Sequence, residues 1–169
     1  GYRELLLRWF EWATFCPVLR MHGDKGPCEA APLDGREWGG GFCHTGLPNE
    51  LWSFGEDVCG ILKSYVVLRE TMKPYLKEVM REASENGSPV MRAMFYEFPG
   101  DETCWTADEQ YMFGPRYLVA PVLYEGMRER QVYLPAGSWR DLNSGEVLEG
   151  GRTVTASAPL EVIPVYERL

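Results

Sequence analysis

The sequence predicts an α/β unit of helices and one buried strand, followed by an all-β unit that forms an antiparallel β-sandwich. Apolar residues recur at helical spacing through the first 87 residues, whereas short apolar runs separated by turn residues fill the rest. Lysine also disappears after Lys77, so every later cationic residue is an arginine. Because the two changes nearly coincide, we expect a domain boundary near residue 88, with one unit at 1–87 and a β-sandwich domain at 88–169.

An amphipathic helix is predicted over residues 3–15, because its apolar side chains follow three- and four-residue steps: Leu5, Leu6, Trp9, Trp12 and Ala13. A short apolar run at 16–21 comes next. Its length and its early proline predict a buried strand that ends at His22. Neither an initiator methionine nor a signal-peptide pattern precedes the helix, so we expect this chain to be a piece of a longer protein.

Residues 23–49 are rich in glycine and proline and predict a long loop. A loop of this length inside a compact chain is more often functional than not. Trp38, Phe42 and the nearby Trp52 argue against a disordered insertion, since solvated segments rarely carry such side chains.

The longest periodic segment, residues 58–86, predicts a helix that Pro74 divides near Thr71. Gly87 is placed to end this segment in the left-handed conformation. Short strands separated by turns are predicted beyond it, at 90–95, 117–123, 131–134, 139–142, 147–148, 153–156 and 162–167. Their even spacing is typical of an antiparallel sandwich or a small barrel.

Composition and charge disfavour several classes of protein. Lys plus Arg number 17 and Asp plus Glu number 25, and the net charge of −8, without a basic cluster, disfavours nucleic-acid binding. No apolar run approaches the roughly 18–20 residues that span a bilayer, and no predicted helix has a basic membrane-surface face, so we expect no membrane partner. The five cysteines are odd in number and widely spaced, which disfavours a disulfide framework and favours a reducing, cytoplasmic compartment.

His22 is the main candidate for a site, since His22 and His44 are the only histidines. It stands at the exit of a buried strand, where side chains of an α/β layer point into the ligand crevice; a hydrogen-bonded structural histidine is the alternative. The cysteines and histidines lack the paired spacing of zinc ligands, so we expect no metal and no cofactor. Adjacent carboxylates at 56–57, 101–102 and 108–109 are typical of solvated turns.

A series of motifs runs nearly from end to end of the chain: Arg8-Trp9-Phe10-x-Trp12-x-x-Phe15-x-Pro17-x-x-Arg20-x-His22-Gly23, Leu68-Arg69-x-x-Met72-x-Pro74-Tyr75-Leu76, Gly87-x-Pro89-Val90-Met91-Arg92-Ala93-Met94, Glu97-Phe98-Pro99-x-Asp101, Gln110-Tyr111-Met112-Phe113-Gly114, Leu118-Val119-Ala120-Pro121-Val122, Val132-Tyr133-Leu134-Pro135-x-Gly137-x-Trp139 and Ile163-Pro164-Val165. In this order the motifs resemble the C-terminal portion of glycoside hydrolase family 31.

The resemblance implies the end of a catalytic (β/α)8 barrel at 1–87 and the first C-terminal β-sandwich domain at 88–169. Family members are retaining α-glycosidases, among them α-glucosidases and α-xylosidases, which act on oligosaccharides and glycosides. Their two catalytic aspartates lie before the first helix seen here, and neither motif is present in this chain. The resemblance therefore implies that no residue of this chain is catalytic, that the chain alone is inactive, and that its main partner is the upstream barrel of the same polypeptide.

The resemblance also implies a role for His22, which matches the histidine that hydrogen-bonds sugar hydroxyls in subsite −1. Arg20 and Asp24 are secondary candidates, the first as an ion-pairing support of the strand end and the second at the rim of the site. Many members reach a Glu-Pro-Trp soon after the His-Gly pair, whereas here the match comes only at 50–52, so preference for glucose or xylose is not carried over. The alternative from another class is a stand-alone carbohydrate-binding or structural β-domain without catalysis.

Overall fold

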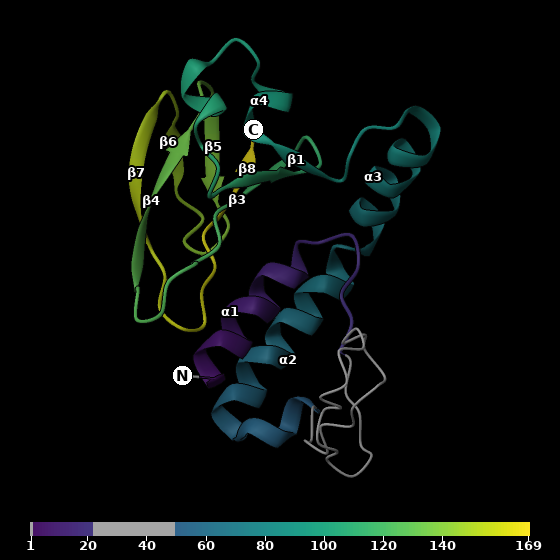
Figure 1. Cartoon of the computed structure of the whole chain (residues 1–169), viewed down its shortest axis with the longest axis vertical. Coiled ribbons are helices and arrows are strands. Elements are labelled where there is room, and N and C mark those ends of the chain that lie inside the picture. The colour runs from purple at the N-terminus through teal and green to yellow at the C-terminus, as the bar shows by residue number, and fades with distance from the viewer. Residues whose placement is uncertain (1, 22–49) are drawn as a thin grey trace, which may run out of the picture.

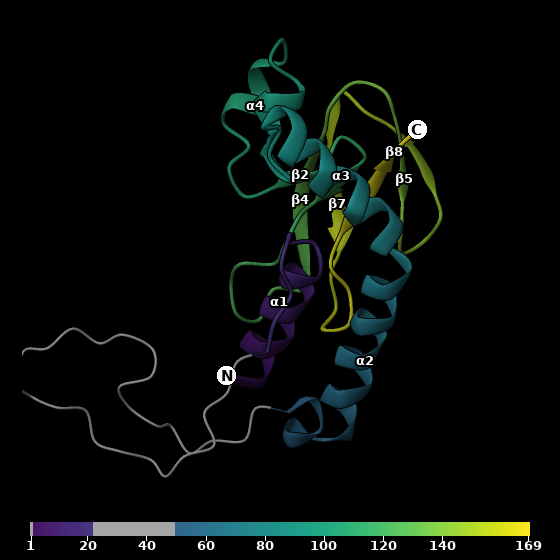
Figure 2. The ribbon, with the colours of Figure 1, turned by 90° about the vertical axis from the view of Figure 1, so that its right-hand side faces the viewer.

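The structure is a computed structural model that describes residues 2–21 and 50–169. Helices α1 and α2 lie side by side at one end of the molecule, and the strands gather at the other (Figure 1). Helix α3 continues from α2 toward the strands, so that α2 and α3 together form one bent rod (Figure 2). The helical elements are α1 (Tyr2–Thr14), η1 (Leu51–Phe54), α2 (Glu56–Thr71), α3 (Lys73–Asn86), α4 (Met94–Glu97) and η2 (Glu102–Trp105).

Helix α1 confirms the first predicted helix and has two apolar faces. Leu7 and Phe10 are buried in a core that α1 shares with α2 and with strands of the β-domain. Tyr2, Leu5 and Trp9 lie on the other face and remain more than half exposed, at 62%, 54% and 61%. Because an amphipathic surface helix normally has one such stripe, the second face is available for another apolar surface.

The strand predicted at 16–21 does not form in the described structure, where the chain turns at Phe15 to Pro17 and continues without regular structure to Met21. The physical reason is pairing. A strand exists only through hydrogen bonds to a neighbouring strand, and every ladder among the described residues lies at 91–168. The loop predicted at 23–49 lies outside the described residues. The described chain resumes at residue 50 and forms the short 3-10 helix η1.

The division of the long helical segment is confirmed. Helix α2 ends at Thr71 and α3 begins at Lys73, with Pro74 in its first turn, where the missing N–H of proline leaves no helical hydrogen bond unmade. Gly87 ends α3 in the left-handed conformation, with φ of 78°, and its N–H donates to Ala83 O at 3.1 Å.

The β-domain contains a six-stranded antiparallel sheet, in the order β1-β2-β3-β8-β5-β6, and a separate two-stranded ladder of β4 and β7. In the ladder, Val132 lies opposite Val154. The six-stranded sheet consists of β1 (Met91–Ala93), β2 (Tyr111–Phe113), β3 (Tyr117–Val119), β5 (Ser138–Asp141), β6 (Val147–Glu149) and β8 (Val165–Arg168), and the ladder of β4 (Glu129–Leu134) and β7 (Arg152–Ser157).

Each strand predicted in the β-domain has a counterpart in the structure, but several bounds differ. The strand predicted at 117–123 ends at Val119, and the one predicted at 162–167 begins only at Val165. The strand predicted at 90–95 stops at Ala93, because residues 94–97 turn into the short helix α4. Arg92 holds this turn, since its guanidinium pairs with Glu97 and its Nε donates to Pro89 O at 2.7 Å. The sequence does not predict strand β2, which forms through its pairing with β1 and β3.

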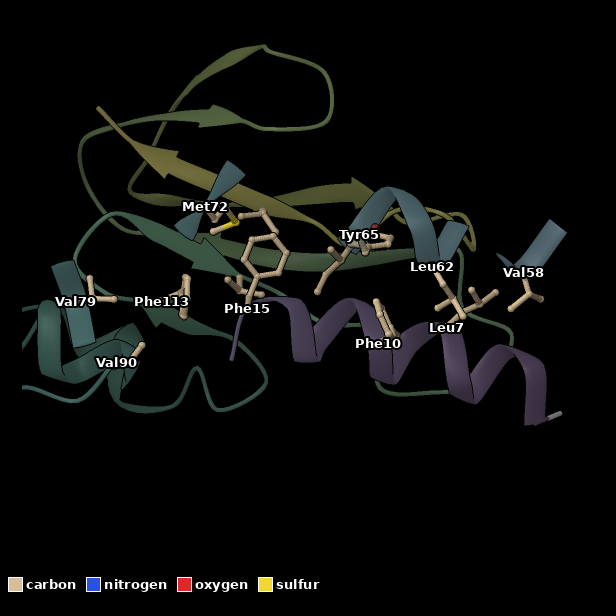
Figure 3. Close-up of a cluster of buried hydrophobic side chains, with 13 residues drawn as sticks. Leu7, Phe10, Phe15, Val58, Leu62, Tyr65, Met72, Val79, Val90 and Phe113 are labelled. Atoms are coloured by element: carbon tan, nitrogen blue, oxygen red, sulfur yellow. The ribbon is translucent and has the colours of Figure 1, made fainter. Parts of the chain in front are cut away.

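Two apolar cores hold the chain together. The first joins the helices to the sheet and contains Leu7, Phe10, Phe15, Val58, Leu62, Tyr65, Met72, Val79, Val90, Phe113, Val119, Ile163 and Val165 (Figure 3). The second lies within the β-domain and is centred on Trp139, which is fully buried and donates its indole N–H to Pro135 O at 2.7 Å. Because the first core takes residues from both ends of the chain, the helices and the β-domain are packed as one body.

Candidate functional site

The segment that follows α1 carries Arg20 and leads along the chain to the other predicted site residues. It runs back along α1 in the opposite direction, as Figures 1 and 2 both show. Between this segment and the exposed face of α1 lies a groove of about 390 Å³. The groove is lined by Tyr2, Leu5, Leu6, Trp9, Phe10, Ala13, Leu19, Arg20 and Met21. Its lining is mostly apolar and aromatic, with the Arg20 cation at the end of the described segment.

The structure places only one of the three predicted site residues. Arg20 is exposed and lines the groove, close to where the description of this segment ends. His22 and Asp24 lie outside the described residues, and the roles predicted for them stay predictions.

A buried arginine and a half-buried tyrosine from distant elements hold the start of this segment. Arg69, on α2, donates from Nη1 to Thr14 O at 2.6 Å and from Nη2 to Pro17 O at 2.9 Å. The Tyr111 hydroxyl, on β2, donates to Phe15 O at 3.0 Å. Burial raises the pKa of Tyr111, so the phenol remains a donor at any ordinary pH. The chain between α1 and the groove is therefore fixed through its backbone carbonyls.

A second polar network joins α1 to the β-domain. The Arg8 guanidinium donates to four backbone carbonyls of that domain, at 2.6 to 3.2 Å, and to Glu11 Oε2 at 3.1 Å. Beside it, the Tyr65 hydroxyl donates to Glu161 O at 2.9 Å and accepts from the Ile163 N–H at 3.1 Å. Arginine suits this place, since its planar fork presents several donors at fixed angles.

Glu11 has an electrostatic feature that often marks a catalytic acid. Burial raises the pKa of Glu11 to about 7, and the Arg8 cation opposes this shift only in part. Glu11 is nevertheless only 1% exposed, it faces Arg8, and it does not line the groove. A general acid must reach the proton-accepting atom of a substrate, so the geometry gives Glu11 a structural role.

Sequence analysis missed these anchors, although a signal was present. Arg69 falls in the buried stripe of its helix, four residues after Tyr65, and Glu11 falls between Leu7 and Thr14 on the buried side of α1. A charged residue at such a position must find buried partners, because an unpaired buried charge is very costly. The sequence could therefore have indicated that these residues are buried, but not which carbonyls they contact.

Of the adjacent carboxylates predicted at solvated turns, only 108–109 lie in a turn, whereas 56–57 begin α2 and 101–102 lie at the start of η2. Asp57 is exposed and pairs with Arg3, and Asp101 accepts from the Thr103 N–H at 3.1 Å and the Tyr133 hydroxyl at 2.7 Å. In the part of the chain that the structure describes, no three His, Cys, Asp or Glu side chains gather closely enough to hold a metal ion. None of the described helices is long and apolar enough to cross a membrane.

Comparison with known families covers both parts of the chain. Residues 1–79 match the TIM-barrel domain of glycosyl hydrolases family 31, and residues 87–169 match the C-terminal domain of the same family. The chain belongs to glycosyl hydrolase family 31. The matches confirm the predicted fold class, in which the end of a (β/α)8 barrel is followed by a β-sandwich. In these terms α1, the segment after it and α2 come from the barrel.

Family 31 relatives match over nearly the whole chain. An α-xylosidase of Saccharolobus solfataricus is 34% identical over 99% of this chain and 20% of its own length. The α-glucosidase 2 of Bacillus thermoamyloliquefaciens is 35% identical over 96% of this chain and 18% of its own length. The crystal structure of a family 31 α-xylosidase from a soil metagenome, complexed with xylose, has a TM-score of 0.87 and 47% identity over 99% of this chain and 25% of that chain. The chain thus spans about a fifth of the length of the curated relatives it matches.

Proposed function

We propose that this chain is the C-terminal portion of a retaining α-glycosidase that hydrolyses terminal α-glucosidic or α-xylosidic bonds of oligosaccharides or glycosides. The observation that carries the proposal is the pair of family 31 matches, to the barrel domain and then to the C-terminal domain, in one chain. Residues 1–87 would complete the catalytic barrel, and residues 88–169 would form the β-sandwich beside it. A non-catalytic sugar-binding domain would have no need of a barrel segment.

In this proposal the chain contributes sugar contacts rather than the catalytic carboxyls. Retention of configuration requires two carboxyl groups about 5–5.5 Å apart on either side of the anomeric carbon. We assign neither group to this chain. The His22 imidazole would hydrogen-bond a hydroxyl of the sugar in subsite −1, because a neutral imidazole can donate one hydrogen bond and accept another. Arg20 would support the end of the segment, and Asp24 would stand at the rim.

The second face of α1 fits the proposed upstream barrel. The groove beside α1 is walled by apolar and aromatic side chains, and Trp9 there is 61% exposed. The strands of a barrel are covered on both faces, and its helices pack on the strands and on one another, so a neighbouring barrel element would bury this face. The segment at 16–21 would then gain the strand partners that it lacks among the described residues.

The test is turnover and stereochemistry with the full-length protein. We expect hydrolysis of p-nitrophenyl α-xyloside or α-glucoside, no hydrolysis of the β-anomers, and an α-configured first product by NMR. An inverted product, or no turnover of either α-glycoside, would overturn the proposal. The 169-residue chain assayed alone should be inactive, because the acid and the nucleophile supply most of the lowering of the barrier.

The site assignment has its own test in His22→Ala, with His44→Ala as the matched control. Loss of a hydrogen bond that strengthens in the transition state should reduce kcat/KM by about 10- to 1000-fold and leave the melting temperature nearly unchanged. The control should keep normal kinetics. A His22→Ala variant with normal kcat/KM and a large loss of stability would make His22 a structural residue.

A further inference from the structure

The three hydrogen bonds to the segment after α1 converge on four consecutive residues, 14–17. Arg69 bridges the first and the last of the four carbonyl positions, at Thr14 O and Pro17 O, and Tyr111 holds Phe15 O between them. Arg69 is buried, with 9% of its surface exposed, and Tyr111 is half-buried against the core that joins the helices to the sheet.

The two anchors come from different parts of the fold. Arg69 stands near the end of α2, which belongs to the barrel match, whereas Tyr111 stands on β2, which belongs to the C-terminal domain match. The β-domain therefore reaches across and holds a backbone carbonyl of a barrel segment. This contact is polar and directional, unlike the apolar packing around it.

A small rotation of the turn at 14–17 is enough to displace Arg20 appreciably. Arg20 lies three residue steps after Pro17. An extended chain covers about 3.3 Å per step, or roughly 10 Å in all. A rotation of about 6° at the anchor would move the Arg20 end by about 1 Å. Displacements of that size at a reacting centre can cost about 100-fold in rate.

We propose that Arg69 and Tyr111 are positioning residues, which fix the turn at 14–17 and thereby aim the following segment at the sugar. This inference rests on the proposed function, in which the segment ends at a substrate-binding face. It gives the C-terminal β-domain a part in catalysis that involves no contact with substrate. Tyr111 would act through Phe15 O, and Arg69 through Thr14 O and Pro17 O.

Tyr111→Phe in the full-length enzyme is the sharpest test, since it removes one hydroxyl and keeps the ring. Tyr75→Phe is the matched control, because the Tyr75 hydroxyl also donates to a backbone carbonyl of the β-domain, Phe113 O, at 2.8 Å. Tyr75 also accepts from the Arg116 N–H at 3.2 Å, so its loss should destabilise the fold at least as much. Neither of these hydrogen bonds of the Tyr75 hydroxyl involves residues 14–17.

We expect Tyr111→Phe to lower kcat/KM about 10-fold, mainly through kcat, while Tyr75→Phe lowers only the melting temperature. Arg69→Met should have a larger kinetic effect than Tyr111→Phe, and Arg69→Lys should restore part of it, because an ammonium can hold one of the two carbonyls. If Tyr111→Phe has the same, normal kcat/KM as Tyr75→Phe, the inference is overturned, whatever the melting temperatures of the two variants. A full-length protein without turnover of any α-glycoside would instead overturn the proposed function, and this inference with it.

Discussion

Glu11 is a buried carboxyl that has a partner for only one of its oxygens. Oε2 accepts from Arg8, whereas no described side chain or backbone group donates to Oε1. The ionised form is therefore poorly solvated, and burial raises the pKa of Glu11 to about 7 from its ordinary value near 4.5. The charged and titratable groups that face it are Arg8 on its own helix, Tyr65 on α2 and Glu161 in the β-domain.

Stability should therefore fall as the pH rises from about 4.5 to about 7. Over this range the folded protein holds the Glu11 proton and the unfolded chain has lost it, so folding becomes less favourable with each step up in pH. The shift from 4.5 to about 7 corresponds to roughly 3 kcal/mol between the two limits. Melting temperatures of the full-length protein and of Glu11→Gln, measured from pH 4.5 to 8, test this, because the neutral amide should flatten the dependence.

Glu4→Gln is the control on the same helix. Hydrogen bonds from Arg128 and the Gly126 N–H lower the pKa of Glu4, so its titration lies below this pH range. The melting temperature of Glu4→Gln should therefore fall between pH 5 and 7 as steeply as that of the wild type. If Glu11→Gln keeps the same slope as the wild type, another group causes the pH dependence and Glu11 is ionised throughout.

At the scale of elements, the hairpin between β2 and β3 is locked against α3 at Gly114. Its φ is 59°, and an added Cβ would lie 2.2 Å from the Tyr75 hydroxyl and 2.6 Å from Val79 Cγ1. Its N–H also donates to Val90 O at 2.7 Å, which ties the hairpin to the chain entering β1. Only a residue without a side chain permits this approach of the hairpin to the helix.

Gly114→Ala should therefore destabilise the full-length protein by about 2–4 kcal/mol, because overpacking adds to the cost of the left-handed backbone. Gly60→Ala is the matched control. Gly60 lies on the exposed side of α2, and an added Cβ would meet nothing within 4 Å, so alanine should stabilise the protein by about 0.5–1 kcal/mol. Urea unfolding of both variants measures the two effects, and a destabilisation by both or by neither would contradict this account.

The elements differ in how far sequence alone could predict them. Periodicity located α1, and Pro74 located the break between α2 and α3, because both signals are local. Strand β2 and helix α4 escaped prediction, since their formation depends on pairing and on the Arg92 contacts rather than on a local pattern. The segment 16–21 is apolar enough for a strand, but its ladder needs partners outside the described residues.

The candidate site was less predictable than the fold, for a related reason. Arg20 was found through its place in a motif, and it does line the groove. Arg69 and Tyr111 were not found, because they bind backbone carbonyls, which every residue has, at separations of 52 to 96 residues. No sequence pattern indicates a hydrogen bond from a side chain to a distant backbone carbonyl. Such a contact can be identified only from the three-dimensional structure.

At the scale of the whole molecule, the exposed apolar face of α1 should make the 169-residue chain self-associate. Tyr2, Leu5 and Trp9 on this face are each more than half exposed, at 62%, 54% and 61%. We expect this chain to bind hydrophobic dyes and to self-associate, because contiguous apolar surface of this kind is rarely left open in a soluble monomer. Dye fluorescence and sedimentation of the purified chain measure both properties.

A double variant, Trp9→Gln with Trp12→Gln, should weaken dye binding and association more than Trp105→Gln does. Trp105 is 59% exposed, but it belongs to a separate stacked pair with Phe95 on the β-domain. If the wild-type chain remains monomeric and does not bind the dye, the second face of α1 needs no further partner to cover it.

The Arg8 contacts have a consequence for the order of events during biosynthesis. Arg8 lies on the first helix, yet the carbonyls that it contacts are 119 to 154 residues further along the chain. At about 5–20 residues per second, the ribosome synthesises these residues roughly 6 to 30 seconds after α1. Until then the guanidinium must stay in water, and the helix cannot seat in the shared core. The last part of the barrel is therefore completed after its C-terminal domain has been made, and translation pauses before residue 158 would prolong the interval in which chaperones can bind α1.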